Sequence, residues 1–254
     1  MVSIITPMYN SEAFISDTIH SILKQTYTNW ELILIDDYSS DNTLLIVDSF
    51  ISKNFKIKLL KNTSNQGAAI CRNMGIEVAR GDFIAFLDAD DLWKPNKLKT
   101  QIEFMKTNRC DICFSSYDLI NEDAKSLNKR IKALPILTYQ KLLKSNYLGN
   151  LTGVYNAKVL GKITSPNLRK RQDWLLWLAA IKKSRKPALG IQESLAFYRV
   201  RENSMSSNKL GLLKYNYWVY KKGLGFSTLK SIIYLLRFLI EHFFVKSKQT
   251  QTIN

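Results

Sequence analysis

Short apolar runs alternate with stretches of helical spacing along the first half of the chain. The runs that predict buried strands cover residues 2–6, 31–35, 56–60 and 83–87. The helices predicted between them begin near Ser11, after Ser40, at Gly67 and at Pro95. Strands that alternate with helices predict an α/β fold with a mostly parallel central sheet and helices on both faces.

The second half of the chain has a less regular pattern. Residues 111–117 and 194–200 predict strands, and residues 139–144 and 173–182 predict helices. From 224 to 245 the chain is apolar and aromatic, which predicts a C-terminal helical segment. Its apolar stripe consists of Leu229, Ile232, Ile233, Leu236, Leu239, Ile240 and Phe243. Such an amphipathic helix can lie in a membrane interface, or it can pack on protein.

The charge of the chain is divided sharply between these halves. Residues 1–124 hold 12 Lys and Arg against 17 Asp and Glu, whereas the remaining residues hold 25 against 4. A basic half can serve as a solvated surface, or it can bind nucleic acid, an anionic membrane or a polyanionic substrate. Basic runs at 169–171 and 182–186 come without a nucleic-acid recognition motif, so an anionic lipid surface is the preferred partner.

Composition and the N-terminus narrow the class of protein further. Hydrophobic residues make up 46% of the 254 positions, which excludes a disordered chain. Three cysteines argue against a disulfide scaffold. The chain starts without a secretory signal and has no apolar run of about 18 residues. We therefore expect a cytoplasmic protein, peripheral on the inner face of the cytoplasmic membrane.

Carboxylates follow two of the predicted strands directly. Asp88, Asp90 and Asp91 come after residues 83–87, and carboxylates this close repel one another unless a cation lies between them. A divalent cation that also binds phosphate oxygens would satisfy them, although an acidic turn before a helix is the alternative. Asp37 follows the strand at 31–35 and can bind a nucleotide base or ribose as well as cap a helix.

The segments that follow the strands occur in an order typical of one enzyme family. They are residues 6–10 (TPMYN), 31–41 (ELILIDDYSSD), 65–73 (NQGAAICRN) and 81–91 (GDFIAFLDADD), followed by 170–177 (KRQDWLLW) and 198–206 (YRVRENSMS). Together they resemble family 2 glycosyltransferases, which have the GT-A fold. The resemblance covers residues 1–220 and is nearest to bacterial enzymes that build teichuronic acid, capsule or lipopolysaccharide.

The resemblance implies a nucleotide-sugar site. Its expected residues are Pro7, Tyr9, Asn10, Glu12, Asp37, Arg72, Asp88, Ala89, Asp90, Arg199, Arg201 and Ser204. Tyr9 is expected to lie against the base, Asp37 and Arg72 to contact uracil, and Asp88 to contact the ribose. Asp90 is expected to coordinate Mn²⁺ or Mg²⁺, and the 198–206 segment to close over the diphosphate. Arg201 stands where many relatives carry a histidine, so it is expected to pair with phosphate oxygens instead.

The resemblance also implies a catalytic base. Asp173 matches the family's base, which is usually preceded by a glutamate, whereas this chain has Gln172. A carboxylate there can take the proton of an acceptor hydroxyl during an inverting displacement at the anomeric carbon. Its alternative role is to cap the helix that it begins.

These expectations give one function and two alternatives. The resemblance implies a metal-dependent inverting glycosyltransferase that moves a sugar from a UDP-sugar to a glycan or lipid-linked glycan. Residues 1–124 would then bind the nucleotide sugar and 125–220 the acceptor, within one catalytic domain, and residues 221–254 would form the tail. The alternatives are a nucleotidyltransferase acting on a sugar phosphate and a basic membrane-binding module without turnover. The sequence leaves the donor sugar, the acceptor and the oligomeric state open.

Overall fold

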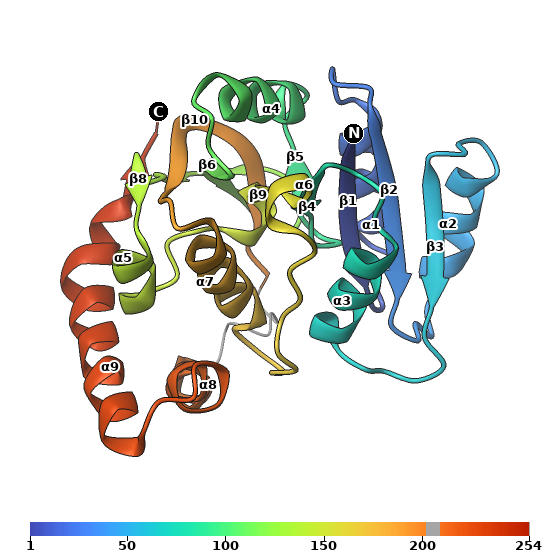
Figure 1. Cartoon of the computed structure of the whole chain (residues 1–254). Coiled ribbons are helices and arrows are strands. Elements are labelled where there is room, and N and C mark those ends of the chain that lie inside the picture. The colour runs from blue at the N-terminus through green and yellow to red at the C-terminus, as the bar shows by residue number, and fades with distance from the viewer. Residues whose placement is uncertain (202–208, 254) are drawn as a thin grey trace.

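The centre of the molecule is a single sheet, which the computed structural model shows for the described residues, 1–201 and 209–253 (Figure 1). Four parallel strands form one side in the order β3-β2-β1-β4. They are β1 (Val2–Met8), β2 (Trp30–Asp36), β3 (Ile57–Lys61) and β4 (Phe83–Phe86). Because all four run the same way, their carboxyl ends share one edge of the sheet.

The other side of the sheet is mixed. Antiparallel β9 (Val154–Asn156) joins β4 to β6 (Ile112–Ile120), and β6 pairs in parallel with β10 (Ala188–Arg199). The remaining strands are β7 (Ser126–Ile131) and β11 (Thr250–Thr252) beyond β6, and β5 (Leu92–Trp93) and β8 (Ile136–Leu137) on β10. The expected α/β class with a mostly parallel central sheet is confirmed, and the short β7, β9 and β11 were not predicted.

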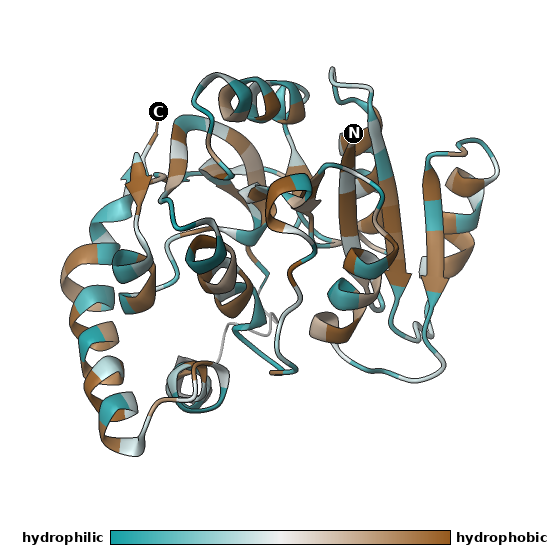
Figure 2. Ribbon diagram, in the orientation of Figure 1, coloured by the Kyte–Doolittle hydropathy of each residue, from teal (hydrophilic) through white to brown (hydrophobic). Residues whose placement is uncertain are grey.

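Two apolar cores cover the two faces of the sheet. Successive side chains of a strand point to opposite faces, so Ile4 and Ile5 of β1 enter different cores. The helices on Ile4's side are α1 (Ile15–Leu23), α2 (Thr43–Ile51) and α4 (Lys97–Thr107). Those on Ile5's side are α3 (Ala68–Val78), α5 (Tyr139–Lys144), α6 (Ala157–Leu160) and α7 (Gln172–Ser184). Figure 2 shows the hydrophobic residues concentrated along the central strands.

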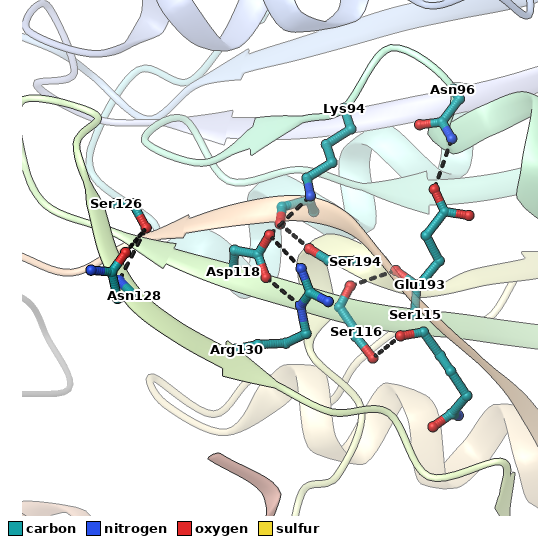
Figure 3. Close-up of polar contacts among 12 residues, drawn as sticks. Lys94, Asn96, Ser115, Ser116, Asp118, Ser126, Asn128, Arg130, Glu193 and Ser194 are labelled. Atoms are coloured by element: carbon teal, nitrogen blue, oxygen red, sulfur yellow. Dashed lines mark hydrogen bonds and ion pairs between the residues drawn. The ribbon is translucent and has the colours of Figure 1, made fainter. Parts of the chain in front are cut away.

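A buried ion cluster connects the strands of the mixed side (Figure 3). Asp118 of β6 accepts hydrogen bonds from Arg130 of β7 at 2.6 Å and from Lys94, which follows β5, at 2.9 Å. Burial alone would raise the pKa of Asp118, but these hydrogen bonds, with one from Ser194, lower it below its ordinary value. The cluster therefore contains an ionised carboxylate that links β6, β7 and the segment after β5.

The C-terminal segment lies along the outer side of α5 and α7 (Figure 1). It consists of α8 (Lys209–Trp218), a π-helical turn (Val219–Gly223), α9 (Thr228–Ile240), a second π-helical turn (Glu241–Val245), a 3₁₀ turn (Lys246–Gln249) and β11. One face of α9 is packed, because Phe238 is buried against Trp174 of α7. The opposite face leaves Leu229, Ile232, Ile233, Leu236 and Ile240 exposed. Among the described residues, no helix has the length and apolarity needed to cross a membrane.

Candidate active site

A cavity of about 580 Å³ opens at the carboxyl edge of the parallel strands. Both halves of the chain line it: residues such as Tyr9, Asp37 and Asp88 from the first half, and Asn146 and Asp173 from the second. The carboxyl edge of a parallel sheet is the usual place for a ligand in open α/β folds. We call the side lined by residues 7–91 the donor end, and the side lined by 131–173 and 246–249 the acceptor end.

Asp37 organises one wall of the donor end. It is buried, and its carboxylate accepts hydrogen bonds from the backbone N–H groups of Gln66 and Gly67 at 2.8 and 2.7 Å. The Asn62 side chain donates a third at 2.8 Å. The carboxylate thus holds the loop before α3, and Asp37 also lines the cavity.

Arg72 and Asp88 form an ion pair at the centre of the donor end. The Nη2 of Arg72 lies 2.5 Å from Oδ1 of Asp88. The other two guanidinium nitrogens of Arg72 are buried, and within the described residues they have no hydrogen-bond partner. Arg72 lines the cavity, although its Nε and Nη1 are themselves buried, and buried polar groups without partners are rare in folded proteins.

The acidic turn after β4 is held by two arginines from the end of β10. The buried Asp91 accepts the backbone N–H of Arg199 at 2.9 Å, and Nε of Arg199 donates to the Asp90 carbonyl at 2.8 Å. Arg201 pairs with the Asp90 carboxylate at 3.0 Å. Burial, and then the neighbouring carboxylates, raises the pKa of Asp91 well above its ordinary value. Burial and Asp88 also raise the pKa of Asp90, against the effect of Arg201.

The remaining residues predicted for the donor side divide into two groups. Pro7, Tyr9 and Ala89 line the cavity. Asn10 and Glu12 are not among the described residues that line it, because their side chains bind the loop before α2. Asn10 accepts from the Ser40 backbone at 2.9 Å, and Glu12 accepts from the Asn42 backbone at 2.9 Å. Ser204 lies outside the described residues.

At the acceptor end, Asp173 lies in the first turn of α7 and faces the cavity. Its Oδ2 accepts a hydrogen bond from the side chain of Asn146 at 2.8 Å, and this bond fixes the orientation of the carboxylate. No side-chain cap begins α7, so the structure leaves the Asp173 side chain to the cavity rather than to helix capping. This placement is what a base for an acceptor hydroxyl requires.

Sequence reasoning missed several residues of the acceptor end. They include Asn146, Asn150, Lys246 and Gln249. Arg171 belongs to a basic run that the sequence assigned to a lipid surface, but its side chain lines the cavity. The run's position directly before Asp173 was the available signal. For Lys246 there was none, because only the path of the C-terminal segment brings residues 246–249 back to the cavity.

The carboxylates of the donor end offer oxygen ligands for a hard cation, but the described residues do not form a complete metal site. Among the described residues, no group of three His, Cys, Asp or Glu side chains could hold an ion. Asp90 keeps one carboxylate oxygen beyond the one that pairs with Arg201. Burial, and then repulsion between the carboxylates, raises the pKa of Asp90 and of Asp91, and a bound cation would relieve that repulsion. These residues fit a divalent cation that takes its other ligands from a bound phosphate.

The fold and the cavity together define an α/β enzyme that binds a nucleotide derivative at the carboxyl edge of its sheet. The chain belongs to Glycosyl transferase family 2, whose profile matches residues 3–163. The family and the GT-A fold expected from the sequence are therefore confirmed.

Two bacterial proteins show the similarity in sequence. TuaG of Bacillus subtilis (strain 168), named for teichuronic acid biosynthesis, is 41% identical over 87% of this chain and 88% of its own length. The Escherichia coli UDP-Glc:α-D-GlcNAc-diphosphoundecaprenol β-1,3-glucosyltransferase WfgD is 40% identical over 94% of this chain and 92% of its own.

A solved structure shows the similarity in fold. Residues 1–349 of Staphylococcus aureus TarS, in complex with UDP-GlcNAc, superpose with a TM-score of 0.74 at 22% identity. The match covers 95% of this chain and 72% of that one.

Proposed function

We propose that this chain transfers a sugar from a UDP-sugar to a hydroxyl of a lipid-linked bacterial surface glycan, with inversion at the anomeric carbon. One observation carries the proposal: the Asp173 carboxylate and the Asp37, Arg72 and Asp88 set line a single cavity. The activity for which WfgD is named supports the choice of donor and of a diphospholipid acceptor. Residues 7–91, together with Arg199 and Arg201, would then hold the donor, and residues 131–173 and 246–249 would hold the acceptor.

The donor end supplies charge stabilisation. When the sugar leaves its donor, negative charge develops on the nucleoside diphosphate, and donors fixed in advance lower the cost of that charge. The two unpartnered N–H groups of Arg72 are such donors, held in place by the ion pair with Asp88. Asp37 is placed to accept from the nucleobase, and Tyr9 to cover it.

The acceptor end supplies the base. A sugar hydroxyl is a poor nucleophile until a base removes its proton in the transition state. Asp173, oriented by Asn146, accepts that proton while the hydroxyl attacks the face of the anomeric carbon opposite the diphosphate. A single displacement of this kind inverts the configuration.

Asp90, together with the diphosphate of the donor, would hold Mn²⁺ or Mg²⁺. The cation would supply positive charge to the leaving diphosphate. Arg201, now paired with Asp90, is placed to turn to the phosphate oxygens when the donor binds.

The exposed face of α9 supports a peripheral position on a membrane. Leu229, Ile232, Leu236 and Ile240 are exposed there, and Phe243 and Phe244 continue the same apolar surface. Lys230 and Arg237 are exposed in the same segment and suit anionic headgroups, whereas Lys246 lines the cavity. Since the acceptor is lipid-linked, this surface would bring the cavity to it.

Release of UDP from a panel of UDP-sugars, measured with Mn²⁺, with Mg²⁺ and with EDTA, tests the proposal. We expect release that rises with a lipid-linked acceptor and falls with EDTA. Release of pyrophosphate instead of UDP would indicate a nucleotidyltransferase. Binding of UDP-sugars without any release would indicate a module without turnover.

A further inference from the structure

We propose that the acceptor end contains its own anion subsite, in which Arg171 and Lys246 bind the diphosphate that joins the acceptor sugar to its lipid. The inference rests on the proposed function and adds a ligand to it: an acceptor diphosphate bound apart from that of the donor. Three observations support the inference: a pair of cations in the cavity, the position of that pair beside Asp173, and the path of the C-terminal segment.

Arg171 is held in a conformation that arginine seldom adopts. Its φ of 67° lies in the left-handed region, where a side chain other than glycine is strained. The Nε of Arg171 donates to Oδ1 of Asn216 at 2.9 Å, while the side chain lines the cavity. Burial lowers the pKa of Arg171, so the fold tolerates both strain and desolvation to keep this cation in place.

Lys246 is the second cation. Its ammonium donates to the backbone carbonyl of Asn146 and lies 5.8 Å from the ring centre of Tyr147. Burial, and then the charge of Arg171, lowers the pKa of Lys246 to about 8, although Asp173 acts in the opposite direction. Two buried cations that repel each other would be stabilised by an anion bound between them.

Asp173 does not balance this charge. It is the one carboxylate among the described residues that line the acceptor end, where Arg169 and Lys170 also contribute side chains. At the donor end, by contrast, Asp88 and Asp90 are each paired with an arginine. A diphosphate, with its high negative charge, matches the excess at the acceptor end, and arginine and lysine are the usual phosphate-binding side chains.

One residue connects this subsite to the reaction. The side chain of Asn146 donates to Asp173, and its backbone carbonyl accepts from Lys246. A diphosphate bound at Lys246 would therefore set the sugar that it carries next to the base. Phe243 and Phe244, both exposed, lie three and two residues before Lys246 in the chain, so the lipid beyond the diphosphate would meet the proposed membrane surface.

The test compares two acceptors: a sugar on a diphospholipid, and the same sugar on an uncharged alkyl chain. The measured quantity is the ratio of their kcat/KM values. We expect Lys246→Met to reduce this preference by about 10- to 100-fold, the value of a hydrogen bond between charged groups. Lys246→Arg should keep most of it. The matched control is Lys248→Met, since Lys248 is an exposed lysine two residues away.

Three results separate the possibilities. An equal preference in wild type and Lys246→Met would overturn the subsite. A weaker affinity for UDP in Lys246→Met, by the same factor as the loss of preference, would assign Lys246 to the donor diphosphate and overturn it as well. Absence of transfer to both acceptors by the wild type would instead refute the proposed function.

The pH dependence of the acceptor preference provides a second readout, which uses the wild-type protein alone. The preference for the diphospholipid should decline as pH rises through about 8, where free Lys246 loses its proton. Transfer to the uncharged acceptor should not follow that decline. Parallel profiles for the two acceptors would argue against Lys246 as the diphosphate ligand.

Discussion

The two ends of the cavity carry opposite charge and are built in opposite ways. At the donor end, carboxylates are in excess, and the arginines among them are already engaged: Arg72 with Asp88, and Arg201 with Asp90. At the acceptor end, cations surround the single carboxylate of Asp173. The net charge of +16 therefore averages two environments that have different ligands.

The difference also reflects chain path. Most of the donor end consists of residues at or just after the ends of β1, β2 and β4, which parallel pairing places together, and Arg72 is added by α3. The acceptor end forms only when α7 begins at Gln172 and the chain returns to the cavity at Lys246. The contacts that bring it back join residues far apart in the sequence. An enzyme built in this way can keep its donor chemistry while the C-terminal segment adapts to the acceptor.

The largest effect is expected from the lone carboxylate of the acceptor end. Asp173→Asn keeps the shape and the contact with Asn146 but removes the base, so kcat should fall by about 10²- to 10⁴-fold. The Kd for UDP should stay close to that of the wild type, since the donor end is intact. Steady-state UDP release and UDP titration measure the two quantities.

An exposed carboxylate serves as the control for that substitution. Asp123→Asn removes the same charge from the turn after β6, where the side chain is largely exposed. Its kcat should equal that of the wild type. If Asp173→Asn retains full activity, the base must be sought elsewhere in the cavity.

Lys97 of α4 differs from the arginines of the donor end, which are paired with carboxylates. Its ammonium is fully buried, and no described carboxylate pairs with it. It lies 3.6 Å from the ring centre of Trp93, and within the described residues its Nζ has no hydrogen-bond partner. Burial lowers its pKa from 10.5 to about 7. The unfolded chain thus binds the extra proton between these values, so the penalty from Lys97 is largest at low pH and shrinks as pH rises.

Lys97→Met should therefore stabilise the protein, and more so in acid. We expect the gain in unfolding free energy to be larger at pH 6 than at pH 9 by roughly 2–3 kcal/mol, from the pKa difference. Urea denaturation at the two pH values measures it. Lys99→Met, an exposed lysine of the same helix, is the control. A gain that is equal at both pH values would mean that burial does not lower the pKa of Lys97.

The third prediction concerns the arginine of the donor end. Arg72→Gln removes the unpartnered N–H donors and leaves Asp88 without its ion pair. The Kd for UDP should rise by about 10- to 100-fold, because hydrogen bonds between charged groups are worth about 1.5–3 kcal/mol. Isothermal titration with UDP measures this, with Arg80→Gln as the exposed control. Unchanged UDP affinity would contradict the assignment of Arg72 to the donor.

The same contrast explains how much the sequence could predict. The strand runs and the acidic segments after them were readable from the sequence, and Asp37, Asp88 and Asp90 do line one cavity, because local periodicity and parallel pairing bring the ends of β2 and β4 together. Their roles in binding the donor stay predictions. The residues at 246–249 were beyond prediction, since their contacts depend on a polar strand, β7, and on a three-residue edge strand, β11. Neither strand has the alternation that marks a strand in sequence.

Asn10 and Glu12 show a second reason why the sequence alone does not determine which residues line the cavity. Both lie in the motif-bearing loop after β1, and the resemblance therefore assigned them to the ligand. Their side chains bind backbone groups of the loop before α2 instead. A polar side chain in a loop can bind either nearby backbone groups or a ligand, and only its position in the folded chain decides between them.

The smallest effect is expected at the apolar face of α9, and it extends the comparison to the surface. Leu236 and Leu45 are both exposed leucines on helices, 55% and 72% accessible, on the acceptor and donor sides of the sheet. If the acceptor side faces the bilayer, Leu236→Ser should weaken binding to anionic liposomes by about 10-fold, the value of one leucine transferred from water. Leu45→Ser should leave this binding unchanged. Sedimentation with vesicles measures both, and equal losses in the two variants would mean that the membrane does not distinguish the two sides.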